Sequence, residues 1–239
     1  MPERRRKSGG DARSRPRGPK VRVKKTAGMT ESSKRWLERQ LNDPYVAEAK
    51  RQGYRSRAAF KLAELDDRFG LLKGVRHIVD LGAAPGGWSQ LAAARLKGAR
   101  IVGIDLLPID AVPGATFLEM DFLASDAEQR LIAAIGGPAD LVLSDLAPST
   151  TGHKNTDHLR TMALCEAAFD FACRVLRPGG AFVAKVLRGG ADHQLLARMR
   201  QAFATVKHAK PPASRADSSE WYVVAQGFKG DDQTLAAEG

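Results

Sequence analysis

The chain has 239 residues, of which 43% are hydrophobic, so it is long and apolar enough for one large domain with a sizeable core. Its 38 Lys and Arg outnumber 27 Asp and Glu, and the formal net charge of +11 favours an anionic partner. No apolar run approaches the roughly 18 residues of a membrane span, and the Arg-rich start lacks the apolar segment of a signal peptide. We therefore expect a cytoplasmic protein that does not bind membranes. We expect a monomer, because no feature of the sequence indicates a protein partner.

Residues 1–28 are predicted to form a disordered basic arm. Residues 1–25 hold eleven Lys or Arg but only two acids, a net +9, and the rest of the chain carries only +2. The segment contains six Pro and Gly and almost nothing apolar, so it cannot bury enough surface to fold alone. Such an arm can bind RNA by displacing counterions from phosphate. The alternatives are a solubilising tail and an anionic membrane contact, the latter disfavoured because no apolar face accompanies the charge.

Two helices are predicted before the first strand. Asp43 suits the start of a helix over Tyr45–Gln52, whereas Ser56 and Gly70 suit the two ends of a helix over Arg57–Phe69. Basic residues interleaved with aromatic rings suit an RNA surface, although any one lysine can simply be solvated. The residues concerned are Lys34, Arg35, Arg39, Lys50, Arg51, Arg55, Arg57 and Lys61, with Trp36 and Tyr45.

From Val75 onward, apolar runs alternate with helical patterns, which predicts an α/β domain with a doubly wound, largely parallel sheet. No helix separates the last two strands, so we expect a hairpin that closes one edge of the sheet. The predicted strands are Arg76–Leu81, Arg100–Asp105, Thr116–Met120, Leu141–Asp145, Ala181–Val186, Val206–Lys210 and Trp221–Gly227. The predicted helices between them are Trp88–Arg95, Ala127–Ile135, His158–Val175 and His193–Phe203.

The stretch His77–Gln90, HIVDLGAAPGGWSQ, is predicted to be the first strand, a cofactor loop and the start of a helix. Its glycines let the backbone approach a ligand, but it lacks the G-x-G spacing of a dinucleotide site. Asp80 at the strand end would repel phosphate and suits a cation, such as the amino-acid ammonium of S-adenosylmethionine. The plainer alternative is an ordinary strand-to-helix turn in a nucleotide-binding fold.

DLGAAPGGWSQ resembles motif I of the class I methyltransferases, and its Pro-Gly-Gly-Trp is similar to the RrmJ/FtsJ family of ribose 2'-O-methyltransferases. The resemblance covers about residues 32–228 and includes DPYV, GIDLLP and WYVVA. It implies a Rossmann-like fold with a mostly parallel seven-stranded sheet, helices on both faces and an antiparallel last strand. We expect this S-adenosylmethionine-dependent domain to span residues 29–228, with a flexible tail over 229–239. Ser149 stands where the family more often has Asn, which puts details of substrate placement in doubt.

Single charges end several apolar runs and would meet beyond the carboxyl ends of the strands, where open α/β sheets bind ligands. Asp105 follows Gly82 by 23 residues, a spacing that suits an acid on the ribose hydroxyls, although it could instead cap the next turn. Asp121 would reach the adenine amino group or stay an exposed loop acid. Trp88 would support the cofactor loop or fill the space between helix and sheet. The predicted cofactor residues are Asp80, Gly82, Pro85, Gly86, Gly87, Trp88, Asp105, Asp121 and Asp145.

Lys185 interrupts the apolar run FVAKVL. Burial disfavours the charged form of a lysine, and a neutral lysine can act as a general base. Asp145, in SDLAP, can hold both this lysine and the approaching nucleophile. The alternative is a structural, salt-bridged strand lysine.

The resemblance supplies a Lys-Asp-Lys-Glu tetrad. Its members match Lys61 in RSRAAFKL, Asp145 in SDLAP, Lys185 in FVAKV and Glu220 in SSEWYVVA. In that family the second lysine is the catalytic base and the other three orient the ribose and tune the base. The assignments of Lys61 and Glu220 rest on the resemblance alone, because local sequence would make them a surface lysine and a strand-edge charge.

The sequence indicates no metal. Cys165 and Cys173 are too few and too widely spaced for a zinc site, and the five histidines are scattered. The resemblance implies methyl transfer to the 2'-hydroxyl of a uridine in large-subunit (23S) ribosomal RNA, within the 50S particle. The alternatives are the same chemistry on tRNA or an mRNA cap, and a catalytically inactive RNA-binding protein of ribosome assembly.

Overall fold

The computed structural model describes residues 21–24, 26, 28–148, 151–187, 193–215 and 217–230. Most of the predicted basic arm and of the predicted tail over 229–239 lies outside these residues. The chain divides into two compact units, Met1–Ala47 and Glu48–Gly239.

The first unit contains a helix that the sequence analysis did not predict, α1 (Glu31–Leu41). The side chain of Thr30 accepts a hydrogen bond from the backbone N–H of Ser33 and thereby caps α1. The next helix, α2 (Pro44–Arg51), begins in this unit and ends in the second. As predicted, a carboxylate oxygen of Asp43 accepts a bond, 3.0 Å long, from the N–H of Tyr45.

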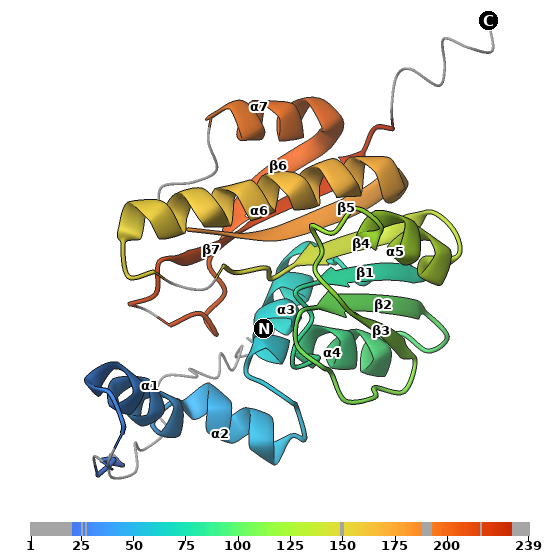
Figure 1. Ribbon diagram of the computed structural model, residues 1–239. Helices are drawn as coiled ribbons and strands as arrows, with labels where there is room; N and C mark the ends of the chain where they lie inside the picture. The colour runs from blue at the N-terminus through green and yellow to red at the C-terminus, as the bar shows by residue number, and fades with distance from the viewer. Residues whose placement is uncertain are drawn as a thin grey trace, which may run out of the picture. The chain divides into compact units, whose positions relative to one another are not determined.

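The second unit is built on a sheet with the order β3-β2-β1-β4-β5-β7-β6, seven strands within the described residues (Figure 1). Strands β1 to β5 run parallel to one another, whereas β7 is antiparallel to both of its neighbours, β5 and β6. The predicted mostly parallel sheet with an antiparallel last strand is therefore confirmed. The strands are β1 (His77–Leu81), β2 (Arg100–Asp105), β3 (Ala115–Glu119), β4 (Ala139–Ser144), β5 (Leu176–Leu187), β6 (Phe203–Ala209) and β7 (Glu220–Phe228).

Helices cover both faces of the sheet (Figure 1). On one face α3 (Ala58–Phe69) and α4 (Gly87–Arg95) pack in the core cluster that contains Ile78. On the other, α5 (Ala127–Ile135), α6 (Lys154–Val175) and α7 (His193–Ala202) pack in the cluster that contains Val79 and Leu81. Alternate residues of β1 thus serve opposite cores, as the period of a strand requires. None of the helices described is long and apolar enough to span a membrane.

The predicted closing hairpin is present, with β7 between β5 and the edge strand β6. Three predicted boundaries are wrong by several residues, and one of them is the start of β6, which lies at Phe203 instead of Val206. The strand predicted to start at Ala181 starts at Leu176, because Leu176 pairs with Ala139 across a register shift. The helix predicted to start at His158 starts at Lys154, since the Asp157 carboxylate accepts bonds from Thr151 and secures the turn before the helix.

Asp140 joins three strands at the end of the sheet remote from the cavity described below. One oxygen of its buried carboxylate accepts bonds of 2.7 Å from the backbone N–H groups of Arg76 and His77, and the other accepts from Arg177 Nε. Burial raises the pKa of this carboxyl, but the Arg177 bond and the two backbone bonds lower it more, so the net pKa is below the ordinary value.

Replacement of Asp140 by Ala should lower the free energy of unfolding by about 2 kcal/mol near pH 7, because two strand N–H groups lose their acceptor. The folded-state pKa is depressed, so this stabilisation is complete above about pH 4 and is lost as the pH falls through the lower folded value. Urea unfolding near pH 7 and near pH 3 measures both effects. An equal difference between wild type and variant at the two pH values would contradict the linkage.

Candidate active site

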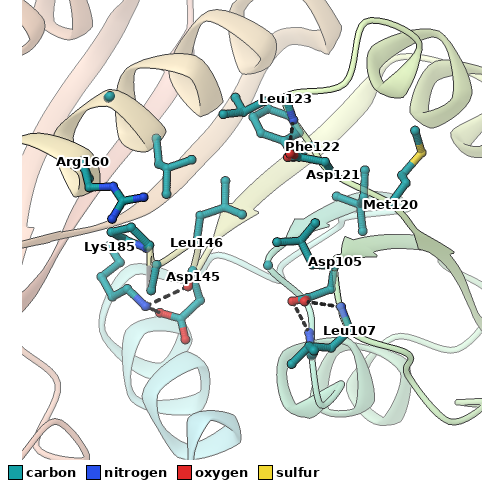
Figure 2. Close-up of a pocket in the computed structure, with 18 residues that line it drawn as sticks. Asp105, Leu107, Met120, Asp121, Phe122, Leu123, Asp145, Leu146, Arg160 and Lys185 are labelled. Carbon is teal, nitrogen blue, oxygen red and sulfur yellow. Dashed lines mark hydrogen bonds and ion pairs between the residues drawn. The ribbon is translucent and has the colours of Figure 1, made fainter. Parts of the chain in front are cut away.

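A cavity of about 830 Å³ opens beyond the carboxyl ends of β1, β2 and β4 (Figure 2). On one side lie the ends of β2 and β3 with Asp105 and Asp121, and on the other lie Asp145 and Lys185. The cavity thus places strand-end charges from four strands in one space. Of the predicted site residues, those that line it are Gly82, Asp105, Asp121, Asp145 and Lys185.

The acids on the β2–β3 side also hold their own loops. Asp105 accepts bonds of 2.9 Å from the N–H groups of Ala84 and Leu107, one on each carboxylate oxygen, and Asp121 accepts one of 2.9 Å from Leu123. Each carboxylate oxygen has a second lone pair, so both acids can still accept bonds from a ligand. Leu107 and Leu123 line the cavity but are 63% and 60% exposed. A flat apolar ring bound between them would cover this surface.

The loop after β1 approaches the backbone of the neighbouring strand very closely. Gly82 has φ +75°, and a Cβ there would lie 2.9 Å from the backbone nitrogen of Leu146. Only glycine fits both the conformation and the space. A hydrogen bond of 2.9 Å from the Asp145 N–H to the carbonyl of Leu81 joins the same two segments, the end of β1 and the chain after β4. The loop therefore fixes the position of Asp145 as well as one wall of the cavity.

Four predicted cofactor residues lie behind this wall and do not line the large cavity: Pro85, Gly86, Gly87 and Trp88. Trp88 is buried, and its indole N–H donates to the carbonyl of Ala58 on α3 over 2.7 Å. Its ring lies 5.7 Å from that of Tyr222, centroid to centroid. Trp88 therefore packs against α3 and Tyr222, and its support of the cofactor loop stays a prediction.

Asp80 also lies behind the loop. It is 1% exposed, accepts a 2.7 Å bond from Ser89 Oγ, and borders a small cavity that it shares with Gly82, Trp88 and Asp145. Burial raises its pKa to about 7, against the lowering effect of the Ser89 bond and with a further increase from the charge of Asp145. This carboxyl is consequently divided between its neutral and charged forms near neutral pH.

Arg55 connects the two loops that border the cofactor side. Its guanidinium donates to the carbonyl oxygens of Pro85 (3.3 Å), Asp110 (2.6 Å) and Ala111 (2.7 Å). A Cβ on Gly86 would lie 3.1 Å from Arg55 Nη1. Arg55 was predicted only as part of an RNA surface. In the structure its charged group is committed to the carbonyl oxygens of the protein itself.

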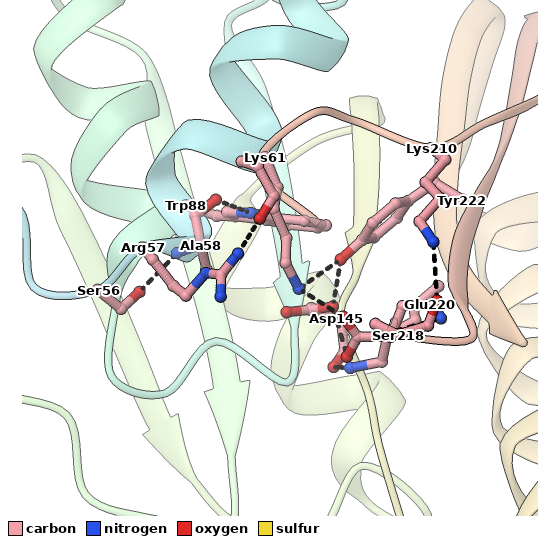
Figure 3. A network of polar contacts seen from close by, with 12 residues as sticks. Ser56, Arg57, Ala58, Lys61, Trp88, Asp145, Lys210, Ser218, Glu220 and Tyr222 are labelled. Atoms are coloured by element: carbon pink, nitrogen blue, oxygen red, sulfur yellow. Dashed lines mark hydrogen bonds and ion pairs between the residues drawn. The ribbon is translucent and has the colours of Figure 1, made fainter. Parts of the chain in front are cut away.

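The four tetrad residues predicted from the resemblance come together from α3, the residue after β4, β5 and β7. Figure 3 shows Lys61, Asp145 and Glu220, and Figure 2 shows Lys185 beside Asp145. Lys61 Nζ lies 3.2 Å from Glu220 Oε2, and Lys185 Nζ lies 3.0 Å from Asp145 Oδ1. Lys185 Nζ also donates to the backbone carbonyl of Asp145 over 2.7 Å. Both lysine side chains are at most 10% exposed, so Lys61 is not the surface lysine that its local sequence suggests.

Tyr222 joins the two ion pairs and was missed by the sequence analysis. Lys61 Nζ donates to its hydroxyl over 3.1 Å, and the hydroxyl donates to Asp145 Oδ1 over 2.9 Å. Tyr222 follows Glu220 by two residues on β7, so the two side chains share one face of the strand. That spacing is the signal that could have identified it.

The charges of this cluster determine its protonation. Burial raises the pKa of Asp145, but the positive charges of Lys185 and Lys61, together with bonds from Lys185 and Tyr222, lower it more, and the net pKa is below the ordinary value. Burial raises the pKa of Tyr222 well above its ordinary value, and the negative charges of Asp145 and Glu220 raise it further. Asp145 therefore stays ionised and Tyr222 stays protonated around neutral pH.

The loop between β6 and β7 is bonded to α3. Arg57 donates to the carbonyl of Ala213, and the Ala213 N–H donates to Glu64 Oε2 over 2.6 Å. These bonds hold the chain that leads into Glu220 against the helix that carries Lys61. Arg57, like Arg55, thus contacts the protein itself. Among the described residues, no group of three or more His, Cys, Asp or Glu side chains could hold a metal ion.

A mostly parallel sheet with a glycine-rich loop after a central strand, and a cavity beyond its strand ends, defines a Rossmann-like domain of the class that binds ligands at this edge of the sheet. Comparison with known proteins makes the class specific. The FtsJ-like methyltransferase family matches residues 54–228, and the chain belongs to this family.

Curated relatives agree with this assignment. The chain is 63% identical over 214 residues to ribosomal RNA large subunit methyltransferase E of Novosphingobium aromaticivorans, covering 90% of this chain and 96% of the relative. The protein of the same name from Rhizorhabdus wittichii is 59% identical over 222 residues, covering 93% and 97%. A crystal structure from Plasmodium falciparum, described as a ribosomal RNA methyltransferase, superposes with a TM-score of 0.66 at 30% identity and covers 74% of this chain and all of that one.

Replacement of Arg55 by Gln should weaken binding of S-adenosylmethionine about tenfold, because up to three charge-assisted bonds that fix the two loops are lost. The turnover of the saturated enzyme should change much less, since Arg55 does not line the cavity. Calorimetric titration of the free protein measures the affinity. Arg130→Gln, on an exposed ion pair of α5, is the matched control. An unchanged affinity in the Arg55 variant would show that the loops hold their positions without it.

Proposed function

We propose that this protein transfers the methyl group of S-adenosylmethionine to a ribose 2'-hydroxyl, that of a uridine in large-subunit ribosomal RNA. One observation carries the proposal: the paired Lys185 and Asp145 form one side of the cavity whose other side carries Asp105 and Asp121. The family assignment supports methyl transfer, and the names of the relatives support a ribosomal RNA substrate.

The residues on the β2–β3 side fit this cofactor. Asp105 can accept bonds from ribose hydroxyls and Asp121 from the adenine amino group, while Leu107 and Leu123 would cover the adenine ring. When bound, S-adenosylmethionine supplies a methyl group activated by a positively charged sulfonium. The acids of the cavity favour that charge.

Lys185 is the general base of the proposed reaction. In its neutral form Nζ would accept the proton of the 2'-hydroxyl, while the oxygen would bond to the methyl carbon and the carbon–sulfur bond would break, leaving its electron pair on the sulfur of S-adenosylhomocysteine. Asp145 holds Nζ at 3.0 Å and stabilises the ammonium that results. Such positioning is most of what methyl transfer requires, because the donor is already activated.

The pair of Lys185 and Asp145 is connected to three further polar side chains, which are Lys61, Tyr222 and Glu220. The positive charge of Lys61 lies one tyrosine hydroxyl away from Asp145, which helps to keep the carboxylate ionised. Glu220 lies 3.2 Å from Lys61 and is 32% exposed, so it can also accept a hydrogen bond from the arriving ribose.

Binding to a ribosomal particle would draw on parts of the chain outside the cavity. The basic arm of residues 1–28 would add affinity for phosphate that does not depend on sequence. The 2'-hydroxyl itself distinguishes RNA from DNA.

The substrate assay offers radiolabelled S-adenosylmethionine to intact large subunits, naked large-subunit RNA and tRNA that lack the modification, and then maps the labelled nucleotide. We expect label on a uridine ribose of the large-subunit RNA, with intact subunits the best substrate. Label on tRNA alone would refute the proposed substrate. Absence of label from every RNA, with RNA binding retained, would indicate a binding protein without catalysis.

Replacement of Lys185 by Ala should lower turnover about 10²–10⁴-fold, the usual contribution of a general base, and leave the affinity for S-adenosylmethionine within about twofold. The matched control is Lys207→Ala, an exposed lysine on β6. Single-turnover rates and calorimetric titration separate the two quantities. Turnover close to wild type in the Lys185 variant would rule out its role as the base.

A further inference from the structure

The large cavity contains two positively charged side chains among its described lining residues, Lys185 and Arg160. Lys185 Nζ is bonded to both the side chain and the backbone carbonyl of Asp145. Arg160 comes from α6 and is exposed to solvent. In Figure 2 its guanidinium lies above Lys185, on the side of the cavity away from Asp105 and Asp121.

Hydrogen bonds secure the backbone at the beginning of α6, the part of the helix that carries Arg160. The carboxylate of Asp157 accepts bonds from the backbone N–H and hydroxyl of Thr151, each 2.7 Å long, and from the N–H of Gly152 at 3.3 Å. The adjacent Thr161 is buried, and its hydroxyl donates to the carbonyl of Asp157 over 2.8 Å. The turn that carries Arg160 is therefore ordered before any ligand binds.

The two sides of the cavity differ in charge. The β2–β3 side has carboxylates, Asp105 and Asp121, which suit hydroxyl groups, an amino group and a cation. The side with Lys185 adds a guanidinium, which suits an anion. In RNA, the carbon next to the one that bears the 2'-hydroxyl carries a phosphodiester. A ribose presented to Lys185 thus brings an anion to the neighbourhood of Arg160.

We propose that Arg160 binds the phosphate on the 3' side of the target nucleotide and so positions the 2'-oxygen against Lys185. The inference rests on the proposed function, since it takes RNA as the substrate. The planar guanidinium can donate two parallel bonds to two phosphate oxygens, which fixes orientation as well as distance. A contact of this kind carries no sequence information, so Arg160 would orient the reacting ribose whatever its base. Arg160 is in these terms a substrate-positioning residue.

The test compares Arg160→Gln and Arg160→Lys with wild type in methyl transfer to large ribosomal subunits that lack the modification. Arg160→Gln should raise the KM for RNA about tenfold and reduce the slope of log affinity against log salt by about 0.7–0.9, the change expected for one phosphate contact. Arg160→Lys should recover part of the loss. The affinity for S-adenosylmethionine should stay within about twofold. Arg174→Gln, at the far end of the same helix and on an exposed ion pair, is the matched control.

A second measurement identifies the phosphate. An RNA fragment containing the mapped nucleotide is made with a neutral methylphosphonate on either the 3' or the 5' side. The 3' replacement should weaken binding to wild type about tenfold and should not weaken binding to Arg160→Gln any further. The 5' replacement should weaken binding to both proteins equally.

Other results would overturn the inference. A tenfold loss of S-adenosylmethionine affinity in Arg160→Gln, with RNA binding unchanged, would mean that Arg160 binds the carboxylate of the cofactor. Equal effects of the 3' methylphosphonate on wild type and variant would mean that Arg160 does not contact that phosphate. Failure of wild type to methylate any RNA would instead refute the proposed function, so the two failures are distinguishable.

Discussion

A partly buried carboxylate just beyond a central strand is the constraint on which the rest of this site depends. Asp145 follows the last residue of β4 and its side chain is 19% exposed, so the charge is stable only if other groups replace the hydration that it has lost. Lys185 on β5 forms an ion pair with the Asp145 carboxylate, and the Tyr222 hydroxyl on β7 donates a hydrogen bond to it. Lys61 on α3 adds a nearby positive charge. The partners that stabilise Asp145 are those that the proposed chemistry uses.

This constraint explains why distant parts of the chain are bonded together. Lys61 and Glu220 are separated by 159 residues, yet their charged groups lie 3.2 Å apart. The contact requires that the loop after β6 stay against α3, which the bonds of Ala213 to Arg57 and Glu64 ensure. On the cofactor side, Arg55 similarly joins the loops after β1 and β2. The basic residues of RSRAAFKL therefore organise the site from within the protein, which is a different role from the RNA surface that their charges suggest.

Local pattern predicted most of the fold. The limits of β2 and of α5 were predicted without error, because an apolar run flanked by turn residues determines a short strand or helix locally. The predicted starts of β5 and α6 were wrong, because pairing with Ala139 and the bonds to the Asp157 side chain are contacts that no periodicity reports. Helix α1 was not predicted, although Thr30 is a residue that commonly caps a helix N-terminus. Asp145 and Lys185 were identifiable as charges at the ends of buried runs, whereas Lys61 and Glu220 depended on resemblance.

The sequence by itself determined an α/β domain, its order of elements, the loop with Gly82, and the rim of strand-end charges. These follow from periodicity and backbone sterics, which act between near neighbours in the chain. Only the tertiary structure decided that Lys61 is buried, that Tyr222 joins two ion pairs, that Trp88 lies behind the loop and that Arg160 shares a cavity with Lys185. Those facts depend on the packing of elements far apart in the chain, and the environment of a charged side chain is fixed only when those elements meet.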